Sequence, residues 1–335
     1  MSRTADQYRI IATGAGWIDR GDRGRLRFEG RDASKFLQAL LTNDIQALMP
    51  GTGAYAAYLT PQGRMIADLR VHHCGDHLLA QVAAGDAAAL AQRFDQLIFS
   101  EDVRVTDVSA SIAQVAVVGQ DAAALIARAF GADQPDEHVE PARLVELPPL
   151  AHVSAGVATI ARGDDLDLPV FDIFLPAADR SAAVERLGAL GVVPVSTDLF
   201  EALRIEAGRP AFGVDMTGET IPLEAGLLDR GISTTKGCYV GQEIIIRVLH
   251  RGGGRVARRL ARLRFDTEAT VPPPAGTVLL HDGRDVGRVT SSAVSLSTGR
   301  VVALGYVHRD QAEPGVRVQA QSAPAVEAEI VGFAG

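Results

Sequence analysis

Along most of the chain, apolar residues recur first at the spacing of a β-strand and then at the spacing of a helix. Residues 25–29 alternate polar and apolar side chains, which predicts a half-buried strand, and apolar residues at helical spacing follow within 36–41. The same order recurs over 111–130 and 170–190. This alternation predicts mixed α/β layers over residues 1–250.

Residues 53–73 have the pattern of a β-hairpin. The turn Thr60-Pro61-Gln62-Gly63 has Pro and Gly at its second and fourth positions and separates two predicted strands. In the second strand, alternate apolar residues from Met65 to Val71 fall on one face, so Asp68 falls on the other. A carboxylate there is either solvated or directed into a cavity, where it could accept an N–H group or hold a cationic amine.

After residue 254 the pattern changes to short alternating runs, which glycine-containing turns such as 282–283 and 314–315 interrupt. This texture predicts an all-β module of the barrel or sandwich type. Three consecutive glycines at 252–254 mark the expected boundary. We therefore expect an α/β region over residues 1–250 and a β domain over residues 255–335.

Composition argues against several classes of protein. A length of 335 residues with 47% hydrophobic and 22% charged residues is typical of a folded chain of two or three domains, and two cysteines cannot form a disulfide framework. The net charge of -8 argues against a surface that coats nucleic acid or anionic membrane. The sequence has no apolar run of about 18 residues, and charges within the first 20 residues argue against a signal peptide. We expect a cytoplasmic protein without a membrane partner.

One short segment carries the most specific candidate chemistry, Lys236-Gly237-Cys238-Tyr239-Val240-Gly241-Gln242-Glu243. Cys238 lies two residues from Lys236, one of only two lysines in the chain. A neighbouring lysine favours the thiolate, which attacks electrophiles or binds metal. The alternative is that Cys238 is a small buried apolar residue and Lys236 a surface charge.

This segment, followed by Arg247 and Arg251-Gly252, resembles the signature of the YgfZ family of folate-binding, iron-sulfur-related proteins. Other segments resemble the parent superfamily, that of the T-protein, or aminomethyltransferase, of the glycine cleavage system. They occur in the order found in that superfamily: Leu41 to Asp44, Glu201 to Gly208, Pro222 to Gly226, Gly287 to Ser291 and Ala303 to Tyr306. The resemblance covers most of the chain. It implies two interleaved α/β subdomains around a central channel, followed by a β-barrel.

The resemblance also implies a folate site. Tyr55 and Asp68 match a tyrosine and an aspartate that surround the folate, Asp172 matches a glutamate, and Arg204 matches an arginine. Judged from the sequence pattern alone, Asp68 is better explained as a solvated strand residue. Asp172 shares its strand face with apolar residues, which is typical of a pocket wall.

Two helix residues assigned to folate binding have other interpretations. Arg204 could be a solvated partner of Glu201, and Glu206 lies on the apolar stripe of its helix, where a carboxylate often forms a structural tie. The chain also departs from the T-protein twice: paired aspartates are reduced to Ala67-Asp68, and a Tyr-Thr-Gly turn is replaced by Arg162-Gly163-Asp164-Asp165. The resemblance therefore implies folate binding more strongly than aminomethyl transfer.

The segment 247–264 has a charge opposite to that of the whole chain. It contains seven arginines, Arg247 first among them, and no acidic residue. A planar guanidinium pairs bidentately with a carboxylate or a phosphate, so these arginines could hold the glutamate tail of folate or a phosphate backbone. They could equally be solvated residues on one face of a strand. No aromatic residues are interleaved for base stacking, so we do not expect direct binding to nucleic acid.

The function that the resemblance implies is a folate-binding accessory factor for iron-sulfur cluster assembly or repair, which indirectly supports iron-sulfur-dependent tRNA modification. The expected partners are tetrahydrofolate or a derivative, and iron-sulfur proteins or their assembly factors. Cys238, Lys236 and Asp68 are the expected catalytic residues, with Cys238 as a transient iron ligand and no resident metal. The alternative is a tetrahydrofolate-dependent, aminomethyltransferase-like one-carbon transferase, in which Asp68 orients an amine near a folate nitrogen.

Overall fold

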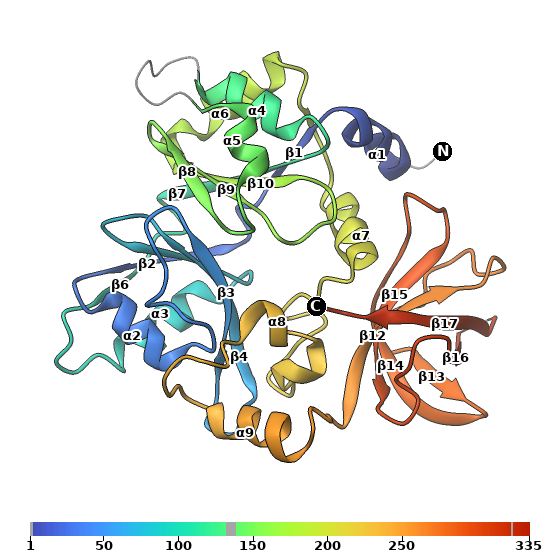
Figure 1. Cartoon of the computed structure of the whole chain (residues 1–335). Helices are drawn as coiled ribbons and strands as arrows, with labels where there is room; N and C mark the ends of the chain where they lie inside the picture. Colours follow the sequence, from blue (N-terminus) through green and yellow to red (C-terminus); the bar gives the residue numbers. More distant parts are fainter. Residues whose placement is uncertain (1–2, 132–138, 323) are drawn as a thin grey trace. The chain divides into compact units, whose positions relative to one another are not determined.

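The computed structural model describes residues 3–131, 139–322 and 324–335. The chain folds into two compact units. The first unit contains residues 1–56 and 68–199, and the second contains residues 57–67 and 200–335. Residues 57–67, the tip of a β-hairpin, thus group with the C-terminal part of the chain (Figure 1).

The first unit contains a six-stranded sheet, and helices pack on one of its faces to form a hydrophobic core. Its strands lie in the order β11 (Val193–Pro194), β1 (Gly16–Asp19), β7 (Ile112–Val118), β10 (Val170–Pro176), β9 (Ala158–Arg162) and β8 (His152–Ala155). Alternate residues of β10, Phe171 and Ile173, share one core cluster with α4 (Ala122–Gly131) and α6 (Arg180–Ala189). The strand-then-helix order expected over residues 170–190 is present as β10 and α6, with a tighter 3-10 turn, η1 (Ala177–Asp179), leading into the helix.

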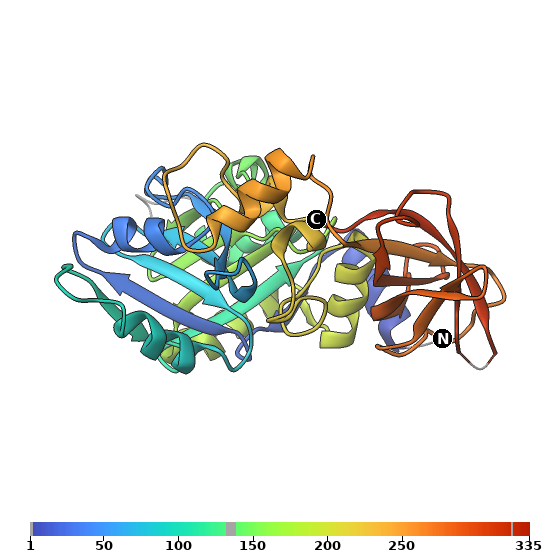
Figure 2. The ribbon, with the colours of Figure 1, turned by 90° about the horizontal axis from the view of Figure 1, so that it is seen from below.

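A second sheet has five strands. They lie in the order β3 (Gly53–Leu59), β4 (Met65–His73), β5 (Leu78–Val82), β2 (Gly24–Glu29) and β6 (Arg104–Asp107). Figure 2 shows β2 and β5 side by side, in antiparallel pairing. Helix α3 (Ala87–Asp95) packs on β2 and on helix α2 (Ala33–Leu40) through aromatic contacts, since the Phe94 ring of α3 lies edge-on to Phe28 of β2 at 5.4 Å and to Phe36 of α2 at 6.3 Å.

The two sheets pack against each other within the first unit. His72 of β4 lies 5.5 Å from Phe174 of β10 and 5.6 Å from His152 of β8, measured between ring centroids. His72 is on the same strand face as Asp68, because both are even-numbered residues of β4. The face of β4 that carries Asp68 is therefore covered by a second sheet.

The barrel predicted after residue 254 is present and closed. Its six strands follow the order β12 (Arg258–Phe265), β15 (Val301–His308), β14 (Arg284–Val294), β13 (Val278–His281), β16 (Arg317–Ala320) and β17 (Val326–Phe333). Small and branched residues fill the interior, among them Val289, Ala303, Val307 and Ile330. The expectation of mixed α/β layers followed by a β-barrel is thus confirmed.

Several shorter elements lie outside these sheets and the barrel. They are α1 (Arg3–Thr13), α5 (Pro141–Glu146), α7 (Thr197–Ala207), the 3-10 turn η2 (Pro222–Ala225), α8 (Leu228–Gly231), α9 (Gln242–Ile246) and the π-helical turn η3 (Arg247–Arg251). Among the described residues, no helix combines the length and the apolar character that crossing a membrane requires.

Candidate functional site

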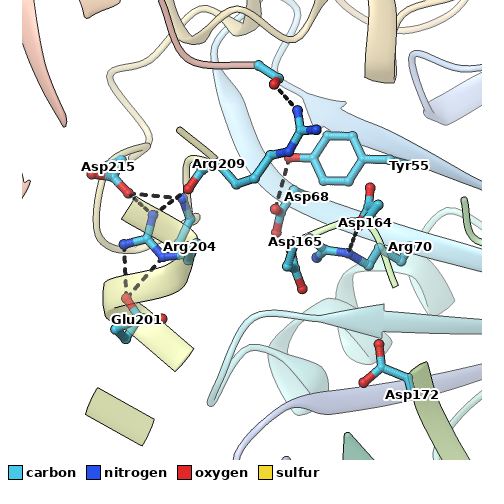
Figure 3. Close-up of polar contacts among 12 residues, drawn as sticks. Tyr55, Asp68, Arg70, Asp164, Asp165, Asp172, Glu201, Arg204, Arg209 and Asp215 are labelled. Carbon is cyan, nitrogen blue, oxygen red and sulfur yellow. Dashed lines mark hydrogen bonds and ion pairs between the residues drawn. The ribbon is translucent and has the colours of Figure 1, made fainter. Parts of the chain in front are cut away.

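A buried tyrosine and a buried aspartate form a pair in the hairpin. Tyr55 of β3 is 1% exposed and Asp68 of β4 is 3% exposed. The Tyr55 hydroxyl donates a 2.9 Å hydrogen bond to Asp68 Oδ2 (Figure 3). Asp68 Oδ1 is also buried, but no described residue donates a hydrogen bond to it. A buried carboxylate oxygen that accepts no hydrogen bond lowers the stability of the fold. Such an atom is typical of a site where a water or a ligand donates the missing hydrogen bond.

Arg70, two residues along the same strand face, holds two further carboxylates. Its Nε donates to Asp164 Oδ1 at 2.9 Å, and its second guanidinium nitrogen pairs with Asp165 (Figure 3). Burial by itself would lower the Arg70 pKa, but the Asp165 and Asp164 carboxylates outweigh burial and hold the pKa well above its usual value. The guanidinium also lies 5.4 Å from the centroid of the Tyr55 ring. The segment that replaces the Tyr-Thr-Gly turn is therefore an ion-pair partner of the hairpin.

Asp172 of β10 is buried in the same layer between the two sheets. Gln114 of β7 donates a 2.8 Å hydrogen bond to Asp172 Oδ1, while the amide oxygen of Gln114 is buried without a donor. Burial raises the pKa of Asp172, although Arg20 and the Gln114 hydrogen bond oppose the rise. Asp172 therefore lies in a dry, polar environment.

Gln81 of β5 is a polar residue that the sequence pattern did not single out. It is directly opposite Arg25 on one side and Arg70 on the other, so these three side chains share a face of the sheet. Both polar atoms of the Gln81 amide are buried and have no hydrogen-bond partner among the described residues. The available signal was a lone glutamine within the apolar strand Leu78–Val82. Gln81, Gln114 and Asp68 together leave several buried polar atoms unsatisfied in one layer.

In the second unit, Arg204 of α7 has protein partners on all its guanidinium nitrogens. Nε and one terminal nitrogen donate to Glu201 at 3.0 and 2.9 Å, and the other donates to Asp215 Oδ2 at 2.7 Å and to the Arg209 carbonyl (Figure 3). Burial would lower the Arg204 pKa, but Asp215 and Glu201 raise it above its usual value. The predicted pair with Glu201 therefore forms, with the arginine buried at 3% exposure and the Glu201 side chain half exposed.

Asp215, the partner of Arg204, is fully satisfied. Besides Arg204, its Oδ2 accepts a hydrogen bond from the Ala211 N–H at 3.1 Å. Its Oδ1 accepts hydrogen bonds from the hydroxyls of Thr290 at 2.5 Å and Ser291 at 2.6 Å. These hydrogen bonds connect the segment after α7 to strand β14 of the barrel, which is typical of a carboxylate that stabilises the fold.

Glu206 and Arg247, both assigned to folate binding from the sequence, lie elsewhere in the second unit. Glu206 accepts hydrogen bonds from the hydroxyls of Ser295 and Ser297 and from the Leu296 N–H, so it fastens α7 to the β14–β15 turn. Arg247 is exposed on η3 and pairs with Glu243 of α9 at 2.7 Å.

The segment around Cys238 is a loop between α8 and α9. Cys238 is a free, exposed thiol, whereas Lys236 is 9% exposed. The Lys236 ammonium lies 5.1 Å from the centroid of the Tyr239 ring, and burial raises the pKa of Tyr239 to about 12. The structure thus exposes the cysteine and buries the lysine, the reverse of the alternative interpretation.

Glycine at position 241 is required by a close approach. Gly241 has a φ of +83°, and a Cβ atom there would lie 2.6 Å from the Thr60 carbonyl oxygen at the hairpin tip. The neighbouring Ile244 packs equally closely on Gly63, where a Cβ would come within 2.7 Å. The cysteine loop is therefore anchored on the hairpin tip within the second unit. Among the described residues, no cluster of three or more His, Cys, Asp or Glu side chains is placed to hold a metal ion.

Comparisons with known proteins agree with this architecture. Residues 2–236 match the GCVT N-terminal domain, and residues 258–333 match the glycine cleavage T-protein C-terminal barrel domain. An aminomethyltransferase from Rubrobacter xylanophilus is 29% identical over 97% of this chain and 84% of its own length. One from Bacillus subtilis is 26% identical over 96% of this chain and 87% of its own length.

A solved structure shows the same fold. The crystal structure of glycine cleavage system aminomethyltransferase T from Bartonella henselae superimposes with a TM-score of 0.86 and 23% identity, covering 98% of this chain and 88% of that one. The match to the first domain alone spans residues 2–236, well over half of the 335 residues. The chain belongs to the family defined by the GCVT N-terminal domain and the glycine cleavage T-protein C-terminal barrel.

Proposed function

We propose that the protein binds tetrahydrofolate or a derivative and transfers a one-carbon unit between the folate and an amine. The observation that carries this proposal is the buried Asp68 carboxylate, with one oxygen held by Tyr55 and the other without a donor. The aminomethyltransferases similar to this chain over nearly its whole length support it. The accessory role in iron-sulfur metabolism, ranked first from the sequence, has no comparable support among these relatives.

The residues between the two sheets fit a ligand rich in ring N–H groups and polar atoms. Asp68 Oδ1 supplies a charged acceptor, while the amide of Gln81 supplies one donor group and one acceptor. Gln114 adds a second acceptor beside the buried Asp172. A pterin ring carries N–H donors and ring-nitrogen and carbonyl acceptors that need hydrogen-bond partners when they are buried. The unsatisfied atoms of Asp68, Gln81 and Gln114 could be those partners.

The bound folate would supply the nitrogen that carries the one-carbon unit. In this proposal Asp68 accepts an N–H from the amine or the pterin and holds the two reactants close, which replaces a collision by a fixed geometry. Tyr55 keeps Asp68 in one orientation, and Arg70 with Asp164 and Asp165 holds the strand in place. The proposal gives Arg204 no contact with the ligand, because protein carboxylates already occupy its donors.

The proposal is tested by turnover with purified full-length protein, tetrahydrofolate and an isotope-labelled aminomethyl donor. We expect transfer of label to the folate, and a loss of about 100-fold or more in Asp68→Asn, because removing one charged transition-state contact costs about 3 kcal/mol. Asp76→Asn is the matched control, since Asp76 lies just after β4 but is exposed. No turnover by the wild type, or an equally active Asp68→Asn, would contradict the proposal.

A second candidate, the accessory factor for iron-sulfur proteins, rests on the exposed Cys238 thiol between the buried Lys236 and Tyr239. In that role the thiolate would handle a sulfur, a one-carbon adduct or an iron ligand. Complementation of a strain lacking the gene tests it through the activity of an iron-sulfur enzyme. Loss of rescue by Cys238→Ala, with folate turnover intact, would favour this role. Full rescue by the same variant would exclude a role for the Cys238 thiol.

A further inference from the structure

A cavity of about 670 Å³ lies entirely within the second unit, on the outer surface of the barrel. It is lined by residues of β12, β14 and β15 and by residues of the segment 214–220. The barrel interior is filled by Val289, Ala303 and Val307, so the alternate residues Tyr306 and His308 point outward. The cavity is therefore separate from the barrel core, and no residue assigned above to folate binding or catalysis lines it.

The carboxylates around this cavity already have cations of their own. Asp215 pairs with Arg204, Glu219 with Arg64, and Asp285 with Arg288. Arg258, which lines the cavity together with Arg288, pairs with Glu224 through Nε at 3.1 Å. Arg284 also lines the cavity and has neither an ion pair nor a side-chain hydrogen bond with any described residue. The uncompensated charge at the cavity is thus positive.

Tyr306 and Arg258 form a second polar element of the cavity. The Arg258 guanidinium lies 4.3 Å from the centroid of the Tyr306 ring, and its two terminal nitrogens have no protein acceptor in the described structure. Tyr306 is 7% exposed, and its hydroxyl is buried. Thr220 lies beside this hydroxyl, but no described group has hydrogen-bond geometry with it. Burial raises the pKa of Tyr306 to about 12, so the hydroxyl stays protonated and can donate.

Apolar groups complete the lining. Val214 and Val286 line the cavity, and Val214 is among the exposed large apolar residues. A planar apolar body fits beside these side chains and the tyrosine ring, while guanidinium groups recognise a carboxylate by paired hydrogen bonds. We propose that this cavity binds a small organic carboxylate with a planar apolar body, held by Arg284, Arg258 and the Tyr306 hydroxyl.

The test is a titration of the full chain with benzoate, and with benzamide as the neutral molecule of the same shape, followed by calorimetry or ligand-observed NMR. We expect benzoate to bind and benzamide to bind at least about tenfold more weakly, because a charge-assisted hydrogen bond is lost. Arg284→Gln should weaken benzoate about tenfold. Arg264→Gln on the same barrel is the matched control and should leave the affinity unchanged, since Arg264 does not line the cavity.

Tyr306→Phe separates ligand binding from folding. Because the hydroxyl has no hydrogen-bond partner of normal geometry among the described residues, this substitution should leave the thermal midpoint unchanged or raised, while benzoate affinity falls about threefold or more. The proposal is overturned if benzoate and benzamide bind equally or not at all at millimolar concentration, or if Arg284→Gln behaves like its control. It is also overturned if 5-formyltetrahydrofolate displaces benzoate, since the carboxylate site would then belong to the folate.

Discussion

Two buried aspartates, one in each unit, have opposite environments. Asp215 accepts four hydrogen bonds, from Arg204, Ala211, Thr290 and Ser291. Asp68 accepts one, from Tyr55, and its second oxygen has no donor among the described residues. A carboxylate with every lone pair occupied contributes to folding, whereas one left incomplete is held at a cost that binding can recover. Burial alone therefore does not identify a functional acid, and the completeness of its hydrogen bonds does.

The largest expected effect is on stability, at the complete site. Asp215→Ala removes a fully buried carboxylate that accepts four hydrogen bonds, and it leaves the half-exposed Glu201 as the remaining carboxylate partner of the buried Arg204. Breaking a buried pair by removing one partner costs about 3–5 kcal/mol in the free energy of unfolding. Urea denaturation measures it, with Asp310→Ala, at an exposed position, as the control. A loss below about 1 kcal/mol in the free energy of unfolding would show that Asp215 does not stabilise the fold as expected.

The incomplete site should behave in the opposite way. Asp68→Asn is expected to lower turnover about 100-fold while changing the free energy of unfolding by less than about 1 kcal/mol, because the charge that lacks a donor is removed. Denaturation and single-turnover assays on one preparation measure both quantities. If Asp68→Asn unfolds as readily as Asp215→Ala, the distinction between the two aspartates fails.

Tyr55→Phe should leave the Asp68 carboxylate with still fewer hydrogen bonds. It removes the 2.9 Å hydrogen bond to Oδ2, and we expect a loss of about 1–3 kcal/mol in the free energy of unfolding. The double variant Tyr55→Phe/Asp68→Asn should recover part of this loss, because the unpaired charge is gone. A strictly additive double-mutant cycle would show that the two side chains do not interact.

The smallest expected effect is a pH-dependent change at Asp172. Burial raises its pKa in the folded state, so the contribution of this group to stability is present in acid and is lost as pH rises above the usual carboxyl range. Asp172→Asn should therefore be slightly more stable than the wild type at neutral pH, with the difference vanishing towards about pH 4. Thermal midpoints across this range measure it, and a difference that grows in acid would contradict the assignment.

The sequence pattern was sufficient for local structure. Alternation over 65–73 predicted a strand whose even-numbered residues share one face, and β4 has that arrangement. Glycine-containing turns after residue 254 predicted the barrel strands. These features depend on the two-residue period of a strand and on turn chemistry, which act over a few residues. The sequence pattern did not predict the 3-10 turn η1 ahead of α6, since a 3-10 turn and an α-helix share similar apolar spacing over their first turn.

The sequence by itself determined which face of β4 carries Asp68, but not whether that face meets water. Only the tertiary structure decided that question, because the covering residues, such as His152 and Phe174, lie about a hundred positions along the chain. The same holds for Arg204, whose partner Asp215 is completed by Thr290 and Ser291 of a distant strand. Periodicity sets the direction of a side chain, whereas its burial, charge and partners depend on contacts between distant segments.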